Sequence, residues 1–436
     1  MIRFDRASVR DPERRGMLLD LLEVGLAAVD PERVVLDALD DDLPRGGVWV
    51  LAIGKAAVPM ARGAAVGLGA RLAGGIALTR AGYGGRPPDL IERFEAGHPL
   101  PDRAGLRAAR AIRGLCARLD REDRLLCLLS GGGSALLAAP PAGVRLEDLA
   151  ATTGLLLASG AAIDEINTVR RHLSTLQGGG LAAAAHPACL TTWILSDVVG
   201  DRPEAIASGP TVPDPTTFDD AAAVLQRYRL WEEIPSAVRT YLENGLAGRV
   251  PETAKPGDPV FAGSQTRILA SNATYLDAVC LEATRIGLRA VRATEPMTGE
   301  AREVGTDLGT RLARLAGSVD GPTLGVSGGE STVTLRGGGQ GGRNQELALA
   351  AAKPLAGIAS VQLAAHATDG TDGPTEAAGA IVDGETIERG LSLGFDAEAS
   401  LRGNDSHPFL AATNDLLWTG PTGTNVADVV LGLLRP

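Results

Sequence analysis

The 436-residue chain has little lysine and few aromatic residues. Only three lysines, Lys55, Lys255 and Lys353, stand against 39 arginines, and Phe, Trp and Tyr together make up 3% of the sequence. No stretch of about 18 apolar residues is free of charged or turn-forming residues, which argues against a transmembrane helix. We therefore expect a core of Ala, Leu and Val. A lysine at a special position in so lysine-poor a chain is a candidate for a specific chemical role.

The sequence also lacks paired cysteines and a positive net charge, and its first residues do not predict a secretory leader. The four cysteines, at positions 116, 127, 189 and 280, show no C-x-x-C pair and no metal-ligand spacing, which is typical of thiols in a reducing compartment. The N-terminus contains no apolar signal segment. The net charge of −11 argues against nucleic acid as the main partner, although one pocket can still be positive. We expect a soluble cytoplasmic protein that binds neither nucleic acid nor a membrane.

The order of apolar and amphipathic segments predicts an α/β fold. Short apolar runs alternate with longer amphipathic stretches, which is typical of βαβ units around a mainly parallel sheet. Strands are expected at 48–53, 75–79, 124–129, 190–195, 267–270, 288–293, 323–326, 331–335, 361–367 and 415–418. Helices are expected at 14–39, 102–119, 146–159, 274–286, 300–316 and 344–352.

A stretch rich in Pro and Gly, at about 247–261, lacks any apolar period and predicts a linker. It divides the chain into a Rossmann-like N-terminal α/β domain over 1–246 and a second α/β domain over 262–436. Two or three domains fit the length at roughly 150 residues each.

The ends of the predicted strands are alike in the two halves. An apolar strand runs into Ser-Gly-Gly at Ser130 and again at Ser327, and another strand ends in aspartate at Asp197 and again at Asp369. Ligands of open α/β sheets bind beyond the carboxyl ends of the strands. We therefore predict an active site in a cleft between the two domains, with two glycine loops and two carboxylates.

Lys55 follows an apolar strand and a glycine, at a predicted strand-to-helix turn. An ammonium is a compact charge suited to phosphate, and the N–H groups of a helix start also bind anions. A surface lysine is the alternative. A second phosphate site is predicted where three glycines would let backbone N–H groups approach a ligand, the alternative being a tight turn without one. Its residues are Ser130, Gly131, Gly132, Gly133 and Ser134.

The standard nucleotide-binding signatures are absent. The chain contains no G-x-x-x-x-G-K-[ST] loop. It also has no G-x-G-x-x-G after a strand with an acidic residue about 20 positions later, which weakens a dinucleotide interpretation.

Carboxylates at strand ends are candidates for metal and proton chemistry. Asp197 and Asp369 can each hold Mg²⁺ together with water, and Asp197 can accept the proton of a substrate hydroxyl. We predict both as metal ligands and Asp197 as catalytic. The alternative is an aspartate that stabilises a turn through its own backbone, and the Asp-Gly pairs at Asp369 and Asp372 favour turns in their own right.

Arg343 is the second cation of interest, because it follows the glycine-rich stretch 337–342 at a predicted helix start. A guanidinium there can bind a carboxylate or a phosphate through two hydrogen bonds, and the loop is long enough for a lid. A hairpin loop with a capping pair is the alternative. We predict Arg343 as catalytic and, with Glu330 and Asn425, as substrate-binding. Asn425 also lies near the expected N-cap of a last helix, so capping competes with ligand contact.

Two further polar segments have competing interpretations. The segment 167–172, Asn-Thr-Val-Arg-Arg-His, fits a ligand-binding helix or a solvated helix face with salt bridges. The segment 405–407, Asp-Ser-His, suggests a hydrolase triad, but no G-x-S-x-G elbow accompanies it, and triad members need to meet in space rather than in sequence.

These motifs occur in an order that resembles one known family. The segments that carry the resemblance are Ile53–Ala57, Gly97–Pro101, Leu195–Val198, Ser208–Thr211, Gly341–Glu346 and Thr422–Asn425. Together they span nearly the whole chain and resemble the class II glycerate 2-kinases, which have a C-terminal MOFRL domain. One departure is that relatives tend to have Lys-Gly-Gly-Arg where this chain has Gln-Gly-Gly-Gly at 177–180, so two positive charges are missing.

The resemblance implies an activity and an architecture. It implies ATP-dependent phosphorylation of D-glycerate at the 2-hydroxyl to 2-phosphoglycerate, with Mg²⁺. It also implies two three-layer α/β domains, the second of MOFRL type, around a deep cleft. The family's essential lysine and arginine would correspond to Lys55 and Arg343. The sequence does not decide whether the protein forms a homodimer. The rivals are an NAD(P)H-dependent hydroxypyruvate reductase, against which the absent dinucleotide motif counts, and a non-catalytic nucleotide sensor.

Overall fold

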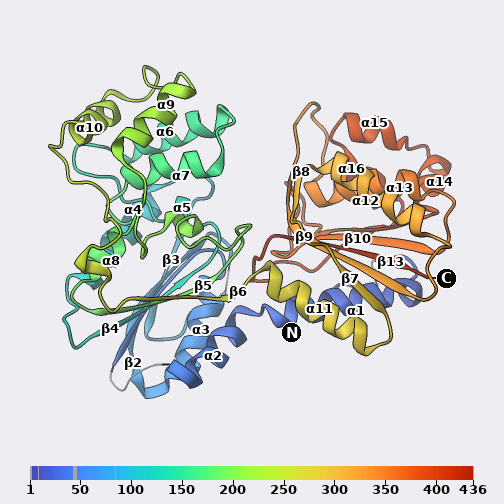
Figure 1. The fold of residues 1–436 in the computed structure, drawn as a ribbon, viewed down its shortest axis with the longest axis horizontal. Coiled ribbons are helices and arrows are strands. Elements are labelled where there is room, and N and C mark those ends of the chain that lie inside the picture. Colours follow the sequence, from blue (N-terminus) through green and yellow to red (C-terminus); the bar gives the residue numbers. More distant parts are fainter. Residues whose placement is uncertain (1, 8, 43–46, 84, 436) are drawn as a thin grey trace. The chain divides into compact units, whose positions relative to one another are not determined.

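The computed structural model describes residues 2–7, 9–42, 47–83 and 85–435. It divides into two compact units (Figure 1). We call residues Pro31–Leu269 the parallel-sheet unit. Residues Met1–Asp30 together with Ala270–Pro436 form the mixed-sheet unit.

The parallel-sheet unit is built on six strands in the order β3-β2-β1-β4-β5-β6. The contacts from β3 through β5 are all parallel. The strands are β1 (Val48–Ile53), β2 (Leu72–Arg80), β3 (Ile91–Ala96), β4 (Arg124–Leu129), β5 (Cys189–Leu195) and β6 (Gln265–Ala270). The helices are α2 (Pro31–Asp42), α3 (Ala57–Leu68), α4 (Arg103–Cys116), α5 (Gly133–Leu136), α6 (Leu146–Ala158), α7 (Ile163–His172), α8 (Gly180–Ala185), α9 (Phe218–Arg227) and α10 (Ser236–Leu246). Short 3₁₀ turns occupy Gly69–Arg71, Ile206–Ser208 and Pro259–Phe261.

Alternating side chains of the central strands make the core of this unit. Leu51 and Ile53 of β1 point to the same face and pack with Ile112 of α4 and Leu181 of α8. α3 packs against β1 and β2 as well. Burial on both faces explains why these strands are almost continuously apolar. Helices α6, α7, α9 and α10 gather in a cluster at one end of the unit and have a hydrophobic core of their own (Figure 1).

The mixed-sheet unit has a path of strands in the order β12-β11-β10-β13-β9-β7, and β8 also pairs with β9. The contacts from β12 to β9 are antiparallel, whereas β7 and β8 run parallel to β9. The strands are β7 (Arg289–Arg292), β8 (Met297–Glu300), β9 (Thr323–Thr332), β10 (Val361–Ala367), β11 (Gly379–Asp383), β12 (Leu416–Leu417) and β13 (Asp428–Leu434). The helices are α1 (Pro12–Ala28), α11 (Asn272–Arg285), α12 (Ala301–Leu315), α13 (Arg343–Leu355), α14 (Thr386–Ser392), α15 (Ala397–Arg402) and α16 (Ser406–Ala412).

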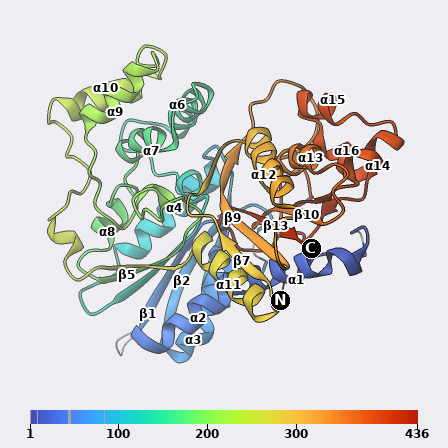
Figure 2. The same ribbon diagram turned by 45° about the vertical axis from the view of Figure 1, so that its right-hand side comes forward.

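Helices cover both faces of this sheet. Figures 1 and 2 show α12 and α13 over one face and α1 and α11 along the other. The N-terminal helix belongs here because Gly25 of α1 leaves room for the ring of Tyr275 of α11: a Cβ on Gly25 would come within 2.2 Å of that ring. The Tyr275 hydroxyl donates a hydrogen bond to the Leu22 carbonyl (2.8 Å). Arg15 of α1 forms a buried ion pair with Asp415 (2.7 Å).

The structure confirms the α/β class, and the strands predicted at 48–53, 124–129 and 361–367 have the bounds observed for β1, β4 and β10. The division of the chain differs from the predicted one, because residues 1–30 pack with the C-terminal part and β6 joins the first sheet.

Four predicted elements are corrected. The helix expected over 14–39 is two helices, α1 and α2. The strands expected at 323–326 and 331–335 are replaced by the single strand β9, which ends at Thr332 and contains glycines 328 and 329, so the second glycine loop expected at Ser327 is part of a strand. The last helix expected after Asn425 is strand β13, which pairs with β10 and β9. No helix among the described residues is both long and apolar enough for a bilayer.

Candidate functional site

Lys55 and the Ser130–Ser134 loop lie together at the carboxyl ends of β1 and β4. The backbone N–H of Lys55 donates to the carbonyl of Gly131 (2.9 Å), and the N–H of Ser130 donates to the carbonyl of Ile53 (2.9 Å). The Ser130 hydroxyl accepts from the N–H of Ala56 (3.0 Å). Because β1 and β4 are parallel neighbours, these bonds continue the sheet into the two turns. The structure therefore brings together the lysine and the first glycine loop, as predicted.

Glycines make this approach possible. Gly54 has a φ of 124°, and a Cβ there would lie 2.3 Å from the Ser130 hydroxyl. Gly132 has a φ of 84°, and a Cβ there would lie 3.4 Å from the side chains of both Lys55 and His98. The stem of Lys55 thus lies across the glycine loop, which is a suitable geometry for an ammonium and backbone N–H groups to share one anion.

A hydrogen-bonded chain supports the end of this loop. The Ser208 hydroxyl donates to the Ser134 hydroxyl (2.8 Å) and lies 3.0 Å from the Asn167 Oδ1. Ser208 is fully buried and has a φ of 59°, and its neighbour Ala207 has a φ of 51°. Left-handed backbone at non-glycine residues is costly and clusters at functional sites. Sequence reasoning missed Ser208 as a site residue, although it lies in one of the segments that carry the family resemblance.

Gln177, the first residue of the segment that departs from the family pattern, has a structural role. Its side chain is buried, and its amide donates to the carbonyl of Ser134 (2.8 Å). The residue thus supports the glycine loop from behind, as a neutral group that a buried position favours over a charged one.

Arg170 of α7 is a further cation beside the loop. It lines a small cavity with Ser134 and Gln177. Burial lowers the pKa of its guanidinium, which approaches Asn167 Oδ1 at 3.4 Å and forms no ion pair with any described residue. A partly buried guanidinium without a carboxylate is well suited to an anionic ligand.

The rest of the segment 167–172 has a structural role. Arg171 forms a buried ion pair with Asp214 (3.2 Å), and His172 lies 3.3 Å from Glu252. Within this segment, Arg171 and His172 form salt bridges, whereas Asn167 and Arg170 lie beside the Ser130–Ser134 loop and are the candidates for ligand binding.

Asp197 follows β5, the neighbour of β4, and is partly buried. Its position after a parallel strand places it at the sheet edge that also carries Lys55 and Ser130. Asp201, four residues on, adopts a φ of 51° in the turn that follows.

Arg343 begins α13 in the mixed-sheet unit and is aimed by Asp428. Its Nε and Nη2 donate to the two carboxylate oxygens of Asp428 at 2.5 and 2.8 Å, and Nη2 lies 3.5 Å from Glu330. Asp428 is fully buried at the start of β13, whereas the Arg343 side chain is 28% exposed. The Nε–Nη2 fork is therefore occupied by protein, and Nη1 forms no hydrogen bond with a described residue.

The pKa shifts of Arg343 and Asp428 indicate that Arg343 stays positively charged. Burial raises the pKa of Asp428, against the opposing effect of Arg343. Burial also opposes the charge on Arg343, but Asp428 and Glu330 outweigh it and raise the pKa of the guanidinium further. Asp428 was not predicted, because it was assigned to a helix; the available signal was an aspartate that opens an apolar run.

Asp372 caps the start of α13 and so determines where Arg343 lies. Its carboxylate accepts from the backbone N–H groups of Asn344 (3.1 Å) and Gln345 (2.8 Å). Burial raises the pKa of Asp372 to about 6, and these two hydrogen bonds oppose the shift. A Cβ on Gly342 would lie 2.3 Å from this carboxylate, so glycine is needed for the approach.

Asp369 and Asn425 lie in two loops that are joined at the ends of β10 and β13. The carboxylate of Asp369 accepts from the N–H of Thr371 (3.1 Å), which is the turn interaction considered as its alternative role. Asn425 accepts from the N–H of Ala427 (3.3 Å) in the turn before β13. The Thr368 hydroxyl joins the loops through the Ala427 carbonyl (2.6 Å).

The triad interpretation of the segment 405–407 is not supported by contacts. Asp405 accepts from the N–H of Gln340 (2.8 Å), and His407 bonds to the side chain of Gln345 (2.8 Å), so the two do not form a triad. No group of three or more His, Cys, Asp or Glu residues suited to a metal occurs in the described part of the chain.

Two family models cover most of the sequence. The domain of unknown function DUF4147 matches residues 17–243, and the MOFRL family matches residues 323–428. A glycerate 2-kinase from Pyrococcus horikoshii is 42% identical over 95% of this chain and 98% of its own. The chain belongs to the glycerate 2-kinase family with a C-terminal MOFRL domain.

Other relatives in the glycerate 2-kinase family agree. A D-glycerate 2-kinase from Thermotoga maritima is 40% identical over 97% of this chain and 99% of its own, and a protein from Agrobacterium vitis named putative hydroxypyruvate reductase is 40% identical over 97% and 95%. The crystal structure of a Thermotoga maritima glycerate kinase superposes with a TM-score of 0.87, at 38% identity, over 97% of this chain and 99% of that chain. The resemblance inferred from the motifs is thereby confirmed.

Proposed function

We propose that the protein transfers the γ-phosphoryl group of ATP to the 2-hydroxyl of D-glycerate and releases 2-phosphoglycerate. Family membership supports the kinase activity. The observation that carries the site is Lys55, whose backbone bonds to Gly131 and whose side chain lies over Gly132. The stem of Lys55 beside a glycine-rich turn is an arrangement in which an ammonium and backbone N–H groups can bind one phosphate together.

Phosphoryl transfer needs positioned positive charge more than covalent participation of the protein. In this proposal Lys55, the N–H groups of the Ser130–Ser134 loop and the partly buried Arg170 bind phosphate oxygens. Asp197 accepts the proton of the attacking hydroxyl or helps to hold Mg²⁺. Mg²⁺ would be held by Asp197 or Asp369 with ATP oxygens, and when bound it supplies charge neutralisation.

Arg343 serves the same reaction through its Nη1 group. Asp428 occupies the Nε–Nη2 side, so the substrate carboxylate or a phosphate meets the remaining edge of the guanidinium. Glu330, which approaches Nη2 and is half exposed, and Asn425 are the proposed polar contacts for the sugar-acid hydroxyls.

The test is incubation of the purified protein with ATP, Mg²⁺ and D-glycerate, followed by separation of 2- from 3-phosphoglycerate. We expect ADP and 2-phosphoglycerate in equal amounts, and markedly slower turnover of L-glycerate. A parallel assay follows NADH and NADPH oxidation with hydroxypyruvate. Reductase activity without ATP-dependent phosphorylation would refute the proposal in favour of the rival name.

A further inference from the structure

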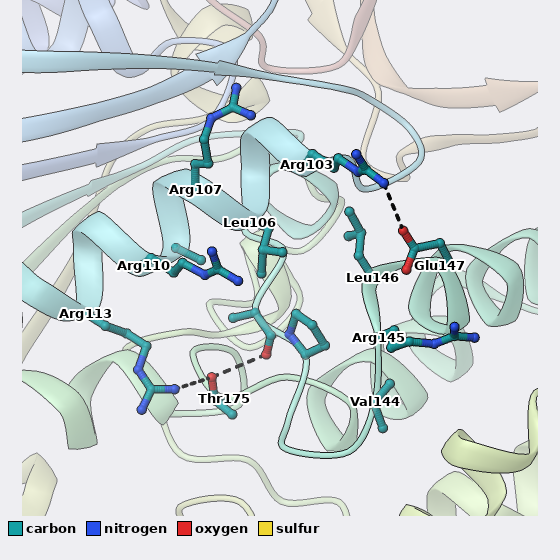
Figure 3. A pocket seen from close by; sticks show the side chains of 13 residues that line it. Arg103, Leu106, Arg107, Arg110, Arg113, Val144, Arg145, Leu146, Glu147 and Thr175 are labelled. Atoms are coloured by element: carbon teal, nitrogen blue, oxygen red, sulfur yellow. Dashed lines mark hydrogen bonds and ion pairs between the residues drawn. The ribbon is translucent and has the colours of Figure 1, made fainter.

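A stripe of arginines lines a surface cavity of the parallel-sheet unit, apart from the candidate residues above. The cavity has a volume of about 640 Å³, within the range of about 300–1,000 Å³ that is usual for small-molecule sites. Its walls are α4 and the segments around residues 139–147 and Thr175 (Figure 3). None of the predicted catalytic or phosphate-binding residues lines it.

The charge of the lining is strongly one-sided. Five arginines and one glutamate line the cavity, although the whole chain carries a net charge of −11. Four of the arginines come from α4 at spacings of four, three and three residues, which places them on one helix face. They are Arg103, Arg107, Arg110 and Arg113, and Arg145 comes from the facing segment.

The protein itself neutralises only part of this charge. Arg145 donates two hydrogen bonds of 3.1 Å to the carboxylate of Asp148. The contact of Arg103 with Glu147 spans 3.8 Å between exposed side chains, and Arg113 bonds only to the neutral Thr175 hydroxyl (3.1 Å). The side chains of Arg107 and Arg110 form no ion pair and no hydrogen bond with any other described residue, and Figure 3 draws no interaction between them and the other lining residues. Like charges three or four residues apart destabilise a helix, so a bound anion would relieve a repulsion built into α4.

The cavity also has an apolar part. Leu106, Pro140, Val144 and Leu146 contribute to the lining, and no aromatic residue does. These side chains can pack against a short carbon skeleton but offer no ring for stacking on a nucleobase. Guanidinium groups bind phosphate through paired hydrogen bonds.

We infer that this cavity binds a small organic phosphate without an aromatic ring, such as a phosphorylated sugar or sugar acid. Arg107 and Arg110 bind the phosphate, and the apolar wall holds the carbon skeleton. The site is structurally linked to the glycine loop: the cavity residue Thr175 donates through its N–H to the carbonyl of Ala139 (2.8 Å), and Gln177, two residues on, bonds to Ser134. The inference does not depend on the proposed kinase activity.

The test measures the binding of pyrophosphate by calorimetry at about 0.15 M salt. The variant is Arg107→Gln with Arg110→Gln, which keeps good helix formers on α4. The matched control is Arg118→Gln with Arg121→Gln, which removes the same charge from exposed positions outside the cavity. We expect binding at least tenfold weaker in the first variant and unchanged in the control.

Further arms separate this site from others. We expect pyrophosphate binding to persist in Lys55→Ala, since that lysine lies outside the cavity. We expect 3-phosphoglycerate or glucose 6-phosphate to displace bound pyrophosphate more readily than ADP does. The inference is overturned if the wild-type protein does not bind pyrophosphate, if both double variants weaken binding equally, if Lys55→Ala abolishes it, or if ADP or a short RNA displaces it best. Circular dichroism checks the fold of every variant, and Arg110→Gln alone serves if the double variant is unstable.

Discussion

The variant Asp428→Asn tests whether Asp428 orients Arg343 in the proposed active site. The substitution keeps the size of a fully buried side chain but removes the charge that faces Arg343, and one of two acceptor oxygens becomes a donor directed at Nε or Nη2. Arg343 then loses the fork that holds it and is free to rotate at the start of α13.

The size of the effect follows from these contacts. Removing one positioned contact to a transition-state charge typically costs about 2.7–4 kcal/mol, which is about 10²- to 10³-fold in rate. Breaking a buried ion pair costs about 3–5 kcal/mol of stability, but Arg343 is 28% exposed and can recover hydration, so we expect about 2–3 kcal/mol.

Steady-state kinetics with ATP and D-glycerate and urea unfolding provide the two readouts. Asp383→Asn is the control, because it also breaks a buried Arg–Asp contact, with Arg15 at 2.7 Å, in the same unit. It should lower stability and leave kcat/KM unchanged. If Asp428 acts through Arg343, the change in kcat/KM from Asp428→Asn should largely vanish in an Arg343→Ala background. Asp428→Asn with kcat/KM within about threefold of wild type and the fold intact would refute the reasoning.

Three other predictions follow. Lys55→Ala should lower turnover by about 10²-fold with unchanged circular dichroism, whereas Lys353→Ala, which removes a surface pair with Glu398, should not; equal activities would contradict the assignment. Because burial raises the pKa of Asp372 from 3.8 to about 6, the folded state holds this proton more tightly, so the free energy of unfolding should fall as pH rises from about 4 to 6. Asp372→Asn should flatten that slope in urea titrations, and an unchanged slope would count against it. Gly25→Ala should destabilise by about 1–3 kcal/mol through its clash with a tyrosine ring, whereas Gly16→Ala on the same helix, with space around it, should be neutral or stabilising by about 0.4–1 kcal/mol; similar melting temperatures would disprove this packing argument.

The local fold was predictable wherever an apolar run met a clear turn signal. β1 and β4 end in glycine-containing turns, and their bounds follow from the pattern. β13 was mistaken for a helix because a short apolar run does not show which period it follows. All seven of its residues are buried, and only its hydrogen bonds to β9 and β10 make it a strand.

Some residues of the proposed site could likewise be predicted from the sequence, and others could not. Lys55 and the Ser130–Ser134 loop were predictable because each is encoded by adjacent residues at one strand end. Asp428 was not, since it lies 85 positions from Arg343 in the chain, and neither residue alone indicates the other.

The sequence by itself determined the α/β class, the family, and the lysine and glycine loop of the proposed phosphate site, because strand–turn–helix signals and motif order are local properties. Only the tertiary structure decided that residues 1–30 pack with the C-terminal part, that Asp428 occupies the fork of Arg343, and that four arginines of α4 line one cavity with Arg145. These features depend on segments that are distant in the chain and meet through side-chain packing, which local patterns do not record.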